Sequence, residues 1–159
     1  MKVLLVCMGN ICRSPTAEAV VRHYLEISGL APIVTVDSAG VTGYHTGEPP
    51  DPRAQRAAAQ RGFDLSKIRA RRVRPDDYHR FDLILAMDRD NLKTLERNCP
   101  SEQRGKLALF TRYARRNRDA EVPDPYYGGP EGFHRVLDML EDAASGLVQE
   151  LRGKVPVAR

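Results

Sequence analysis

VLLVCMGNICRSP, at residues 3–15, joins an unbroken apolar run to a cysteine, a short loop and a helix start. The run at residues 3–6 has no polar alternation, so it predicts a strand that is buried on both faces. Ser14 followed by Pro15 predicts a helix N-terminus, with Ser14 as the N-cap and Pro15 in the first turn. Residues 7–13 must then form a tight loop between the strand and the helix.

This loop is expected to bind an anion. Its backbone N–H groups converge near the start of the helix, whose dipole adds about half a positive charge. Arg13 supplies a full charge and a planar fork that fits two phosphoryl oxygens. We expect the Cys7 thiol to ionise in such a field and to act as a nucleophile. From these residues alone a second interpretation stays open, in which Cys7 is a small buried strand-end residue and Arg13 a surface charge.

Strand-like and helix-like segments alternate along the rest of the chain. Apolar and β-branched runs predict strands at residues 33–40, 81–87 and 106–110. Helical periodicity predicts helices at residues 15–28, 52–61 and 133–151, with Asp51 as the cap of the second and Gly29 and Gly62 at the ends of the first two. A short helical turn is predicted after Pro75, and a further helix, capped by Asp88 or Asp90, is predicted to run to residue 98. The alternation predicts one α/β domain over residues 1–159, with a parallel sheet and helices on both faces. Ligands of such sheets bind beyond the carboxyl ends of the strands, where Cys7 lies.

The composition is that of an ordinary globular protein, with 42% hydrophobic and 29% charged residues. The first apolar run stops at Cys7 and is too short for a signal peptide or a membrane span. The chain has 3 cysteines, an odd number that argues against a disulfide framework and for a reducing compartment. We therefore expect a cytoplasmic protein that does not insert into membranes, and a monomer by default.

A net charge of +4 raises the question of nucleic acid binding. The densest basic run, residues 69–74, has no interleaved aromatic residues and no accompanying nucleic-acid signature. We interpret this run as a solvated face, or as a field that attracts acidic phosphorylated substrates. No nucleic acid partner is expected.

The loop at residues 7–15 resembles the active-site loop of the low-molecular-weight protein tyrosine phosphatases. Two more segments are similar to that family, DSAG at residues 37–40 and DPYY at residues 124–127. The resemblance covers essentially the whole chain in the same order. It implies a flavodoxin-like, Rossmannoid fold in three layers, with a four-stranded parallel sheet of order 2-1-3-4. It also implies hydrolysis of phosphotyrosine monoesters on protein substrates, tyrosine kinases being one such class, with phosphate and vanadate as inhibitors.

The resemblance assigns the catalytic roles to three residues. Cys7 is implied to be the nucleophile that forms a cysteinyl-phosphate, and Asp124 the general acid and later the base. Arg13 binds the phosphate together with the other residues of the loop, which are Met8, Gly9, Asn10, Ile11, Cys12 and Ser14. From the residues alone, Asp124 is a good proton donor because prolines on both sides restrict its backbone. A simple turn is an equally good interpretation of that segment without the resemblance.

Several further residues are expected to support the site. Asn10 tolerates the left-handed backbone that such a loop requires, and the Ser14 hydroxyl can hydrogen-bond the Cys7 sulfur. The cleft walls are expected to be Tyr44, Tyr126 and Tyr127. The family usually has tryptophan in place of Tyr44, and relatives often carry a histidine where this chain has Ile68. We expect surface or core roles for the four histidines of this chain, and no catalytic one.

The second cysteine of the loop has a separate expected role. In the resembled family Cys7 and Cys12 can pair on oxidation, which would protect Cys7 from irreversible oxidation. We expect no metal or other cofactor, because Cys99 is distant and no His or Cys pair completes a zinc site. Cys99 itself is expected to be structural.

Three other functions compete with phosphotyrosine hydrolysis. A thiol-coupled arsenate reductase would need a relay of further cysteines, and this chain offers only Cys99. A phosphoarginine phosphatase has a small polar residue where this chain has Ile11. A phosphotyrosine-binding or redox-sensing module without turnover would have no need of both Cys7 and Asp124.

Overall fold

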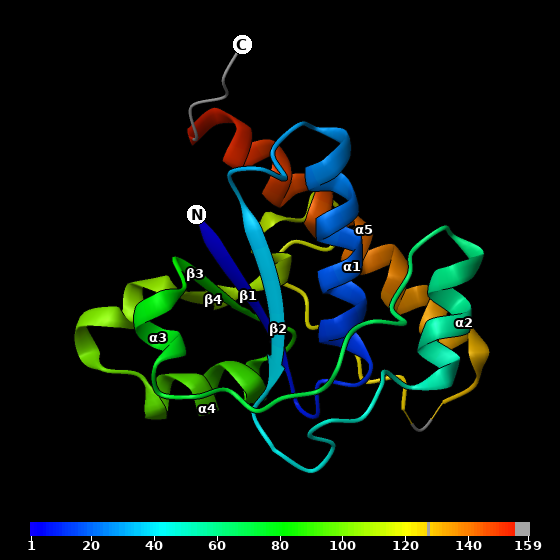
Figure 1. Ribbon diagram of the computed structural model, residues 1–159, viewed down its shortest axis with the longest axis horizontal. Helices are drawn as coiled ribbons and strands as arrows, with labels where there is room; N and C mark the ends of the chain where they lie inside the picture. Colours follow the sequence, from blue (N-terminus) through cyan, green and yellow to red (C-terminus); the bar gives the residue numbers. More distant parts are fainter. Residues whose placement is uncertain (127, 155–159) are drawn as a thin grey trace.

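A four-stranded parallel sheet forms the centre of the computed structural model, which describes residues 1–126 and 128–154. Its strands are β1 (Lys2–Cys7), β2 (Thr35–Gly40), β3 (Leu83–Ala86) and β4 (Leu107–Leu109). They pair in the order β2-β1-β3-β4, so β1 has a neighbour on each side (Figure 1). The sheet order 2-1-3-4 implied by the resemblance is confirmed.

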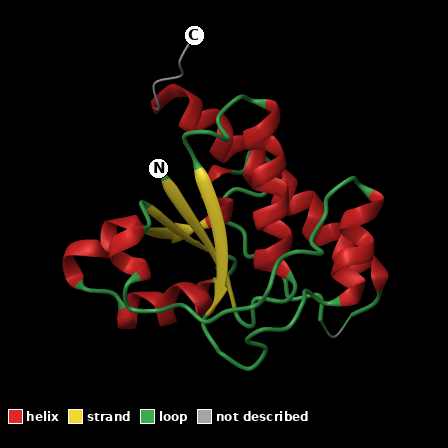
Figure 2. Cartoon of the chain, in the orientation of Figure 1, coloured by secondary structure: helices red, strands yellow, loops and turns green. Residues whose placement is uncertain are grey.

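Helices cover both faces of this sheet, which gives three layers (Figure 2). On one face lie α1 (Arg13–Ile27), α2 (Pro52–Gln60) and α5 (Pro130–Lys154), and on the other lie α3 (Asp77–Arg80) and α4 (Arg89–Asn98). Successive β1 side chains alternate between the two faces. Leu5 and Cys7 belong to the core under α1 and α5, whereas Leu4 and Val6 belong to the core under α3 and α4. Burial on both faces explains the unbroken apolar run at the start of the chain.

Most of the predicted helix signals are confirmed. Asp51 and Asp88 cap α2 and α4, each accepting a hydrogen bond from a backbone N–H in the first turn. Gly29 and Gly62 follow α1 and α2 with positive φ angles of 77° and 87°, which favour glycine. The apolar stripe predicted for the last helix is buried throughout: Phe133, Val136, Leu137, Leu140, Ala144, Leu147, Val148 and Leu151.

The prediction that Ser14 caps the first helix is wrong. Helix α1 begins at Arg13, its N-cap residue is Cys12, and no side chain caps it. The Ser14 hydroxyl lies instead next to the Cys7 sulfur, a partner available only inside the loop. The predicted second, third and fourth strands are longer than the observed ones, and the 3-10 helix Ser101–Lys106 was not predicted. No helix among the described residues is long and apolar enough to cross a membrane.

The basic run at residues 69–74 has a structural role that the sequence did not indicate. Its backbone pairs with the end of β2, since Gly40 N–H donates to the Arg71 carbonyl and Val73 N–H to the Gly40 carbonyl. The Arg71 guanidinium forms ion pairs with Asp77 at 2.9 Å and Asp37 at 3.0 Å. The prediction of a solvated face therefore fails for Arg71, which fastens this segment to α3.

Replacing Asp77 with Ala is expected to lower the free energy of unfolding by about 3 kcal/mol, since Arg71 would lose a buried carboxylate. The matched control is Asp76→Ala, because the Asp76 side chain is 72% exposed and lies 3.8 Å from Arg80. That control is expected to cost less than about 0.5 kcal/mol. Urea unfolding measures both, and equal losses would contradict a structural role for the Arg71 to Asp77 pair.

Candidate active site

The loop after β1 is held by backbone hydrogen bonds from the segment that follows β2. Val41 N–H donates to the Cys7 carbonyl at 3.0 Å, and Thr42 N–H donates to the Met8 carbonyl at 3.0 Å. The loop also packs directly on Gly40, where a Cβ atom would lie 2.8 Å from the Met8 carbonyl oxygen. The DSAG segment therefore ends in glycine because the loop backbone occupies the space of a side chain.

The Cys7 sulfur lies inside this loop and is 2% exposed as a residue. It is 3.0 Å from the Ser14 hydroxyl oxygen and accepts a hydrogen bond from Asn10 N–H at 3.3 Å. The predicted contact between Ser14 and Cys7 is confirmed. Among the residues that the structure describes, Gly9, Ile11 and Cys12 donate no backbone N–H to the protein, so these donors are available to a ligand.

Asn10 is the hydrogen-bonding centre of the loop. Its φ angle is 58°, which confirms the predicted left-handed backbone. Its amide nitrogen donates to the hydroxyls of Ser14 at 2.8 Å and Ser38 at 3.0 Å. Its amide oxygen accepts Arg71 N–H at 3.0 Å. A backbone donor thus contacts the asparagine near the position where relatives carry a histidine and this chain has Ile68.

A buried carboxylate supports this centre from behind. Glu18 accepts a hydrogen bond from the Ser38 hydroxyl at 2.7 Å and pairs with Arg22 at 2.6 Å. Glu18 is a charged residue, yet it is buried in α1 together with its apolar neighbours Ala17 and Ala19. Sequence reasoning missed it, and the only signal available was an acidic residue beside the apolar face of a predicted helix.

Arg13 is 2% exposed, so it is not the surface charge of the alternative interpretation. Its guanidinium donates to Asp88 at 2.7 Å and to the Val122 carbonyl at 3.0 Å, and Asp124 lies 3.7 Å away. Burial by itself lowers the pKa of this guanidinium, but Cys7, Asp88 and Asp124 raise it above its usual value. Arg13 is therefore a fixed positive charge. Asp88 was predicted only as a helix cap, and it serves both as the cap and as the partner of Arg13.

A cavity of about 300 Å³ opens above the loop. Its lining brings together most of the predicted site residues: Cys7, Met8, Gly9, Ile11, Cys12, Arg13, Tyr44, Asp124 and Tyr126, with Thr42 and His45 in addition. The Asp124 carboxylate accepts Tyr126 N–H at 3.0 Å, which orients it within the loop. Tyr44 is 90% exposed and stands at the rim. Tyr127 lies outside the described residues.

His45 was not predicted to be at the site, yet it lines the cavity and lies 2.6 Å from Glu48. Its ring also limits the space over Gly9, where a Cβ atom would lie 3.0 Å from the imidazole. The polar composition of its loop gave no sign that His45 faces the cavity together with Tyr44.

The three cysteines have different surroundings. Cys12 is buried, and burial together with Asp51 raises the pKa of its thiol well above the usual range. All three thiols are free. Cys99 lies in the core under α4, on the opposite face of the sheet from Cys7. Within residues 1–126 and 128–154, no group of three or more His, Cys, Asp or Glu side chains could hold a metal ion.

Known proteins resemble this chain in both sequence and structure. A family model described as low molecular weight phosphotyrosine protein phosphatase matches residues 2–157. A low molecular weight protein-tyrosine-phosphatase of Streptomyces coelicolor is 43% identical over 157 residues, covering 97% of this chain and 95% of that protein. A crystal structure of a protein tyrosine phosphatase from Entamoeba histolytica superposes with a TM-score of 0.93 at 43% identity, covering 98% and 99% of the two chains. Vibrio vulnificus Wzb, in complex with benzylphosphonate, superposes with a TM-score of 0.83 at 31% identity, covering 94% and 97%. The chain belongs to the low molecular weight phosphotyrosine protein phosphatase family.

Proposed function

We propose that this protein hydrolyses phosphotyrosine monoesters through a cysteinyl-phosphate intermediate on Cys7. The observation that carries the proposal is the presence of Cys7, Arg13 and Asp124 around one small cavity. Phosphate ester hydrolysis needs a nucleophile, charge neutralisation and a proton donor, and these three side chains provide them. The Streptomyces coelicolor relative, named a protein-tyrosine-phosphatase, supports the same activity.

In this proposal the loop binds the phosphoryl group before the reaction begins. The available N–H groups of Gly9, Ile11 and Cys12 and the N-terminus of α1 supply partial positive charge, and Arg13 supplies a full one. Asp88 and the Val122 carbonyl fix the guanidinium, so that little conformational freedom is lost when an anion binds. Because the donors are already oriented, they can stabilise the charge that develops on the equatorial oxygens.

The reaction then proceeds in two steps. The Cys7 thiolate attacks phosphorus while Asp124 donates a proton to the leaving phenolic oxygen. Asp124, now a carboxylate, removes a proton from water, which hydrolyses the cysteinyl-phosphate and releases phosphate and the Cys7 thiolate. The hydrogen bonds from Ser14 and Asn10 N–H stabilise the thiolate both before attack and as it departs.

The rim of the cavity supports an aromatic substrate. Met8, Tyr44 and Tyr126 are exposed large hydrophobic residues that also line the cavity, so a phenyl ring can pack against them. Benzylphosphonate, the ligand of Vibrio vulnificus Wzb, carries a phosphonate group next to an aromatic ring, as phosphotyrosine carries a phosphate group next to one. Phosphotyrosine proteins are the proposed substrates, and Tyr127 remains a predicted wall of the cleft.

The competing functions receive less support from the geometry. Cys99 is buried on the other face of the sheet, where it cannot take part in a thiol relay with Cys7. Ile11 lines the cavity with an apolar side chain, which favours tyrosine over arginine phosphate. A binding module without turnover would not need a proton donor, so the position of Asp124 beside Arg13 favours an enzyme.

A redox role of Cys12 belongs to the same proposal. A peroxide would oxidise the Cys7 thiolate to the sulfenic acid and be reduced to water or an alcohol, and condensation with the Cys12 thiol would then form a disulfide and release water. The position of Cys12 supports this because Cys7 and Cys12 line the same cavity.

Replacing Cys7 with Ser is expected to abolish turnover, and Asp124→Ala to slow phosphotyrosine hydrolysis by about 100-fold or more. Asp138→Ala, which removes an exposed carboxylate on α5, is the control and should leave the rate unchanged.

Because the thiolate and the protonated carboxyl are needed together, a plot of the wild-type rate against pH should be bell-shaped with a mildly acidic optimum. A rate that climbs steadily to about pH 8, or near-normal rates for Asp124→Ala, would remove the acid assignment.

Gly40→Ala is expected to weaken vanadate binding by about tenfold or more, because the new methyl group would push the loop backbone out of place. Gly105→Ala is the matched control, since a Cβ atom there meets nothing within 4 Å. Competitive inhibition by vanadate measures both affinities. An unchanged affinity in Gly40→Ala would show that the loop does not depend on its contact with β2.

After treatment with hydrogen peroxide and then dithiothreitol, the wild-type protein should regain most of its activity. Cys12→Ser should regain much less, because Cys7 would be oxidised beyond the sulfenic acid. Cys99→Ser serves as the control and should recover like the wild type. Equal recovery of all three proteins would exclude protection by Cys12.

A further inference from the structure

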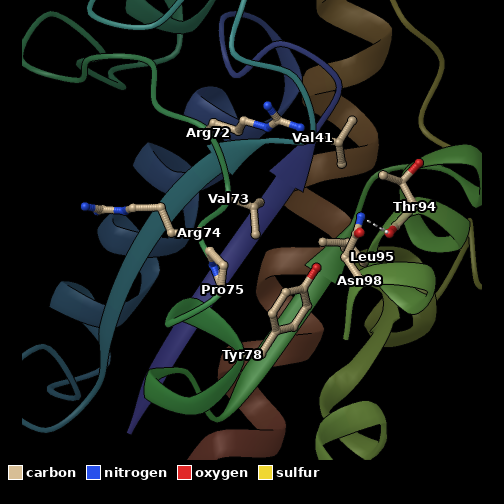
Figure 3. Close-up of a pocket in the computed structure, with 9 residues that line it drawn as sticks. All are labelled: Val41, Arg72, Val73, Arg74, Pro75, Tyr78, Thr94, Leu95 and Asn98. Atoms are coloured by element: carbon tan, nitrogen blue, oxygen red, sulfur yellow. Dashed lines mark hydrogen bonds between the residues drawn. The ribbon is translucent and has the colours of Figure 1, made fainter. Parts of the chain in front are cut away.

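A second cavity, of about 420 Å³, lies between the segment at residues 72–75 and helices α3 and α4 (Figure 3). It is larger than the cavity above the active-site loop and shares no lining residue with it. Its walls include the apolar side chains of Val41, Val73 and Leu95. Nothing in the proposed phosphatase reaction uses this cavity.

Tyr78 provides a polar group that is directed into it. The residue is 3% exposed, and Figure 3 shows its hydroxyl pointing toward the space between Val73 and Leu95. No hydrogen bond to this hydroxyl is formed by the part of the chain that the structure describes. Burial raises the pKa of Tyr78 to about 12, so the hydroxyl is a hydrogen-bond donor at neutral pH. The hydroxyl is open to the solvent of the cavity, so a bound ligand would replace water as its hydrogen-bond partner.

Arg72 adds a positive charge to the lining of the cavity, and its side chain extends toward Val41 (Figure 3). Its guanidinium has no carboxylate within 4.0 Å among the described side chains, in contrast to Arg71, which has two. No Asp or Glu lines the cavity. Arg74 also belongs to the lining, but its side chain extends away from the other labelled residues in Figure 3.

Asn98 adds one acceptor. Its amide nitrogen donates to the Thr94 carbonyl at 2.9 Å, and in the described structure its amide oxygen accepts no hydrogen bond. A hydroxyl group on a ligand could accept from Tyr78 and donate to Asn98. A flat apolar body would pack on the Val41, Val73 and Leu95 side chains, and a carboxylate would match the fork of Arg72.

We propose that this cavity is an effector site for a small aromatic carboxylic acid that carries a hydroxyl group, held by Arg72, Tyr78 and Asn98. The inference goes beyond the proposed phosphatase function, because the site lies apart from the active-site cavity. A cavity of this size falls within the range of small-molecule sites, about 300 to 1,000 Å³.

Val41, which lines the cavity, and Arg71, which adjoins its lining, are hydrogen-bonded to the active-site loop. Val41 N–H donates to the Cys7 carbonyl at 3.0 Å. On the other wall Val73 N–H donates to Gly40, and Arg71 N–H donates to the amide oxygen of Asn10. The segments of Val41 and Val73 are also joined to each other at Gly40, so an occupant that packs on both acts on the backbone that positions the loop. Binding of the acid and of an oxyanion are therefore coupled, each changing the affinity for the other by the same factor.

The binding test uses 6-hydroxy-2-naphthoate and the full-length protein saturated with vanadate, so that the active site is already filled. In 1H–15N NMR titrations we expect the largest shifts at the amides of Val41, Val73, Tyr78 and Leu95. Arg72→Gln should weaken binding by about tenfold, and Tyr78→Phe by about threefold. Arg74→Gln is the matched control and should bind like the wild type. Neither Arg72 nor Tyr78 belongs to the catalytic machinery, so basal activity should be unchanged in all three variants.

Two results would overturn the site: no shifts in this region at millimolar probe, or equal binding by wild type, Arg72→Gln and Tyr78→Phe. Equal binding of the neutral 6-hydroxy-2-naphthamide would overturn the assignment of an acid as ligand.

The coupling test measures vanadate affinity with and without the probe. We expect the probe to change this affinity by about twofold or more in the wild type and to leave it unchanged in Arg72→Gln. Vanadate affinity that does not respond to bound probe would overturn the effector role, while the phosphatase proposal would stand.

Discussion

The hydrogen bonds of Asn10 hold the active-site loop in the one shape that its chemistry requires. Asn10 sits in the left-handed region and connects Ser14, Ser38 and Arg71, which come from three separate segments. A left-handed backbone at a residue with a side chain costs about 1 kcal/mol or more, and it persists because the surroundings determine it. The buried hydrogen bonds of Asn10 hold the backbone in this conformation. Ser38, one of the partners of Asn10, is in turn hydrogen-bonded to Glu18 of α1. The shape of the loop is thus a property of the folded core and not of the loop alone.

Charge at the site is arranged in the same way. Arg13 is buried between the Cys7 sulfur and two carboxylates, Asp88 and Asp124, which differ in their contacts. Asp88 is close to the guanidinium and also caps α4, so its position is fixed twice. Asp124 is farther away and belongs to the loop before α5, where its carboxylate can approach a leaving group. In the proposed reaction Arg13 binds the anion, Asp88 orients the Arg13 guanidinium and Asp124 exchanges protons.

The sequence predicted best what depends on neighbouring residues. The apolar run, Cys7, Arg13 and the proline after Ser14 are local signals, and they located the strand, the loop and the helix correctly. The cap role of Ser14 failed because the Cys7 sulfur, brought near only by the loop, was the better partner. Strand ends were predicted too long, since pairing with neighbouring strands rather than apolar content decides where a strand stops.

Contacts between distant residues could not be predicted. Asp88 lies 75 residues from Arg13 in the sequence, and its capping pattern already gave it a sufficient role. The structural use of Arg71 was hidden in a run of arginines that looked like a solvated surface. The cavity around Tyr78 is formed by two helices and a loop, none of which has a sequence pattern that indicates a ligand. Such features depend on how the sheet and the helices pack, and a pattern among neighbouring residues carries no information about that packing.

The most direct test of the account is a crystal structure of the protein soaked in vanadate. We expect the oxyanion inside the loop at residues 8–14, with the Cys7 sulfur in line with the vanadium and the Arg13 guanidinium donating to two of its oxygens. A loop that stays empty at saturating vanadate, with Arg13 bonded only to Asp88 and Val122, would contradict it.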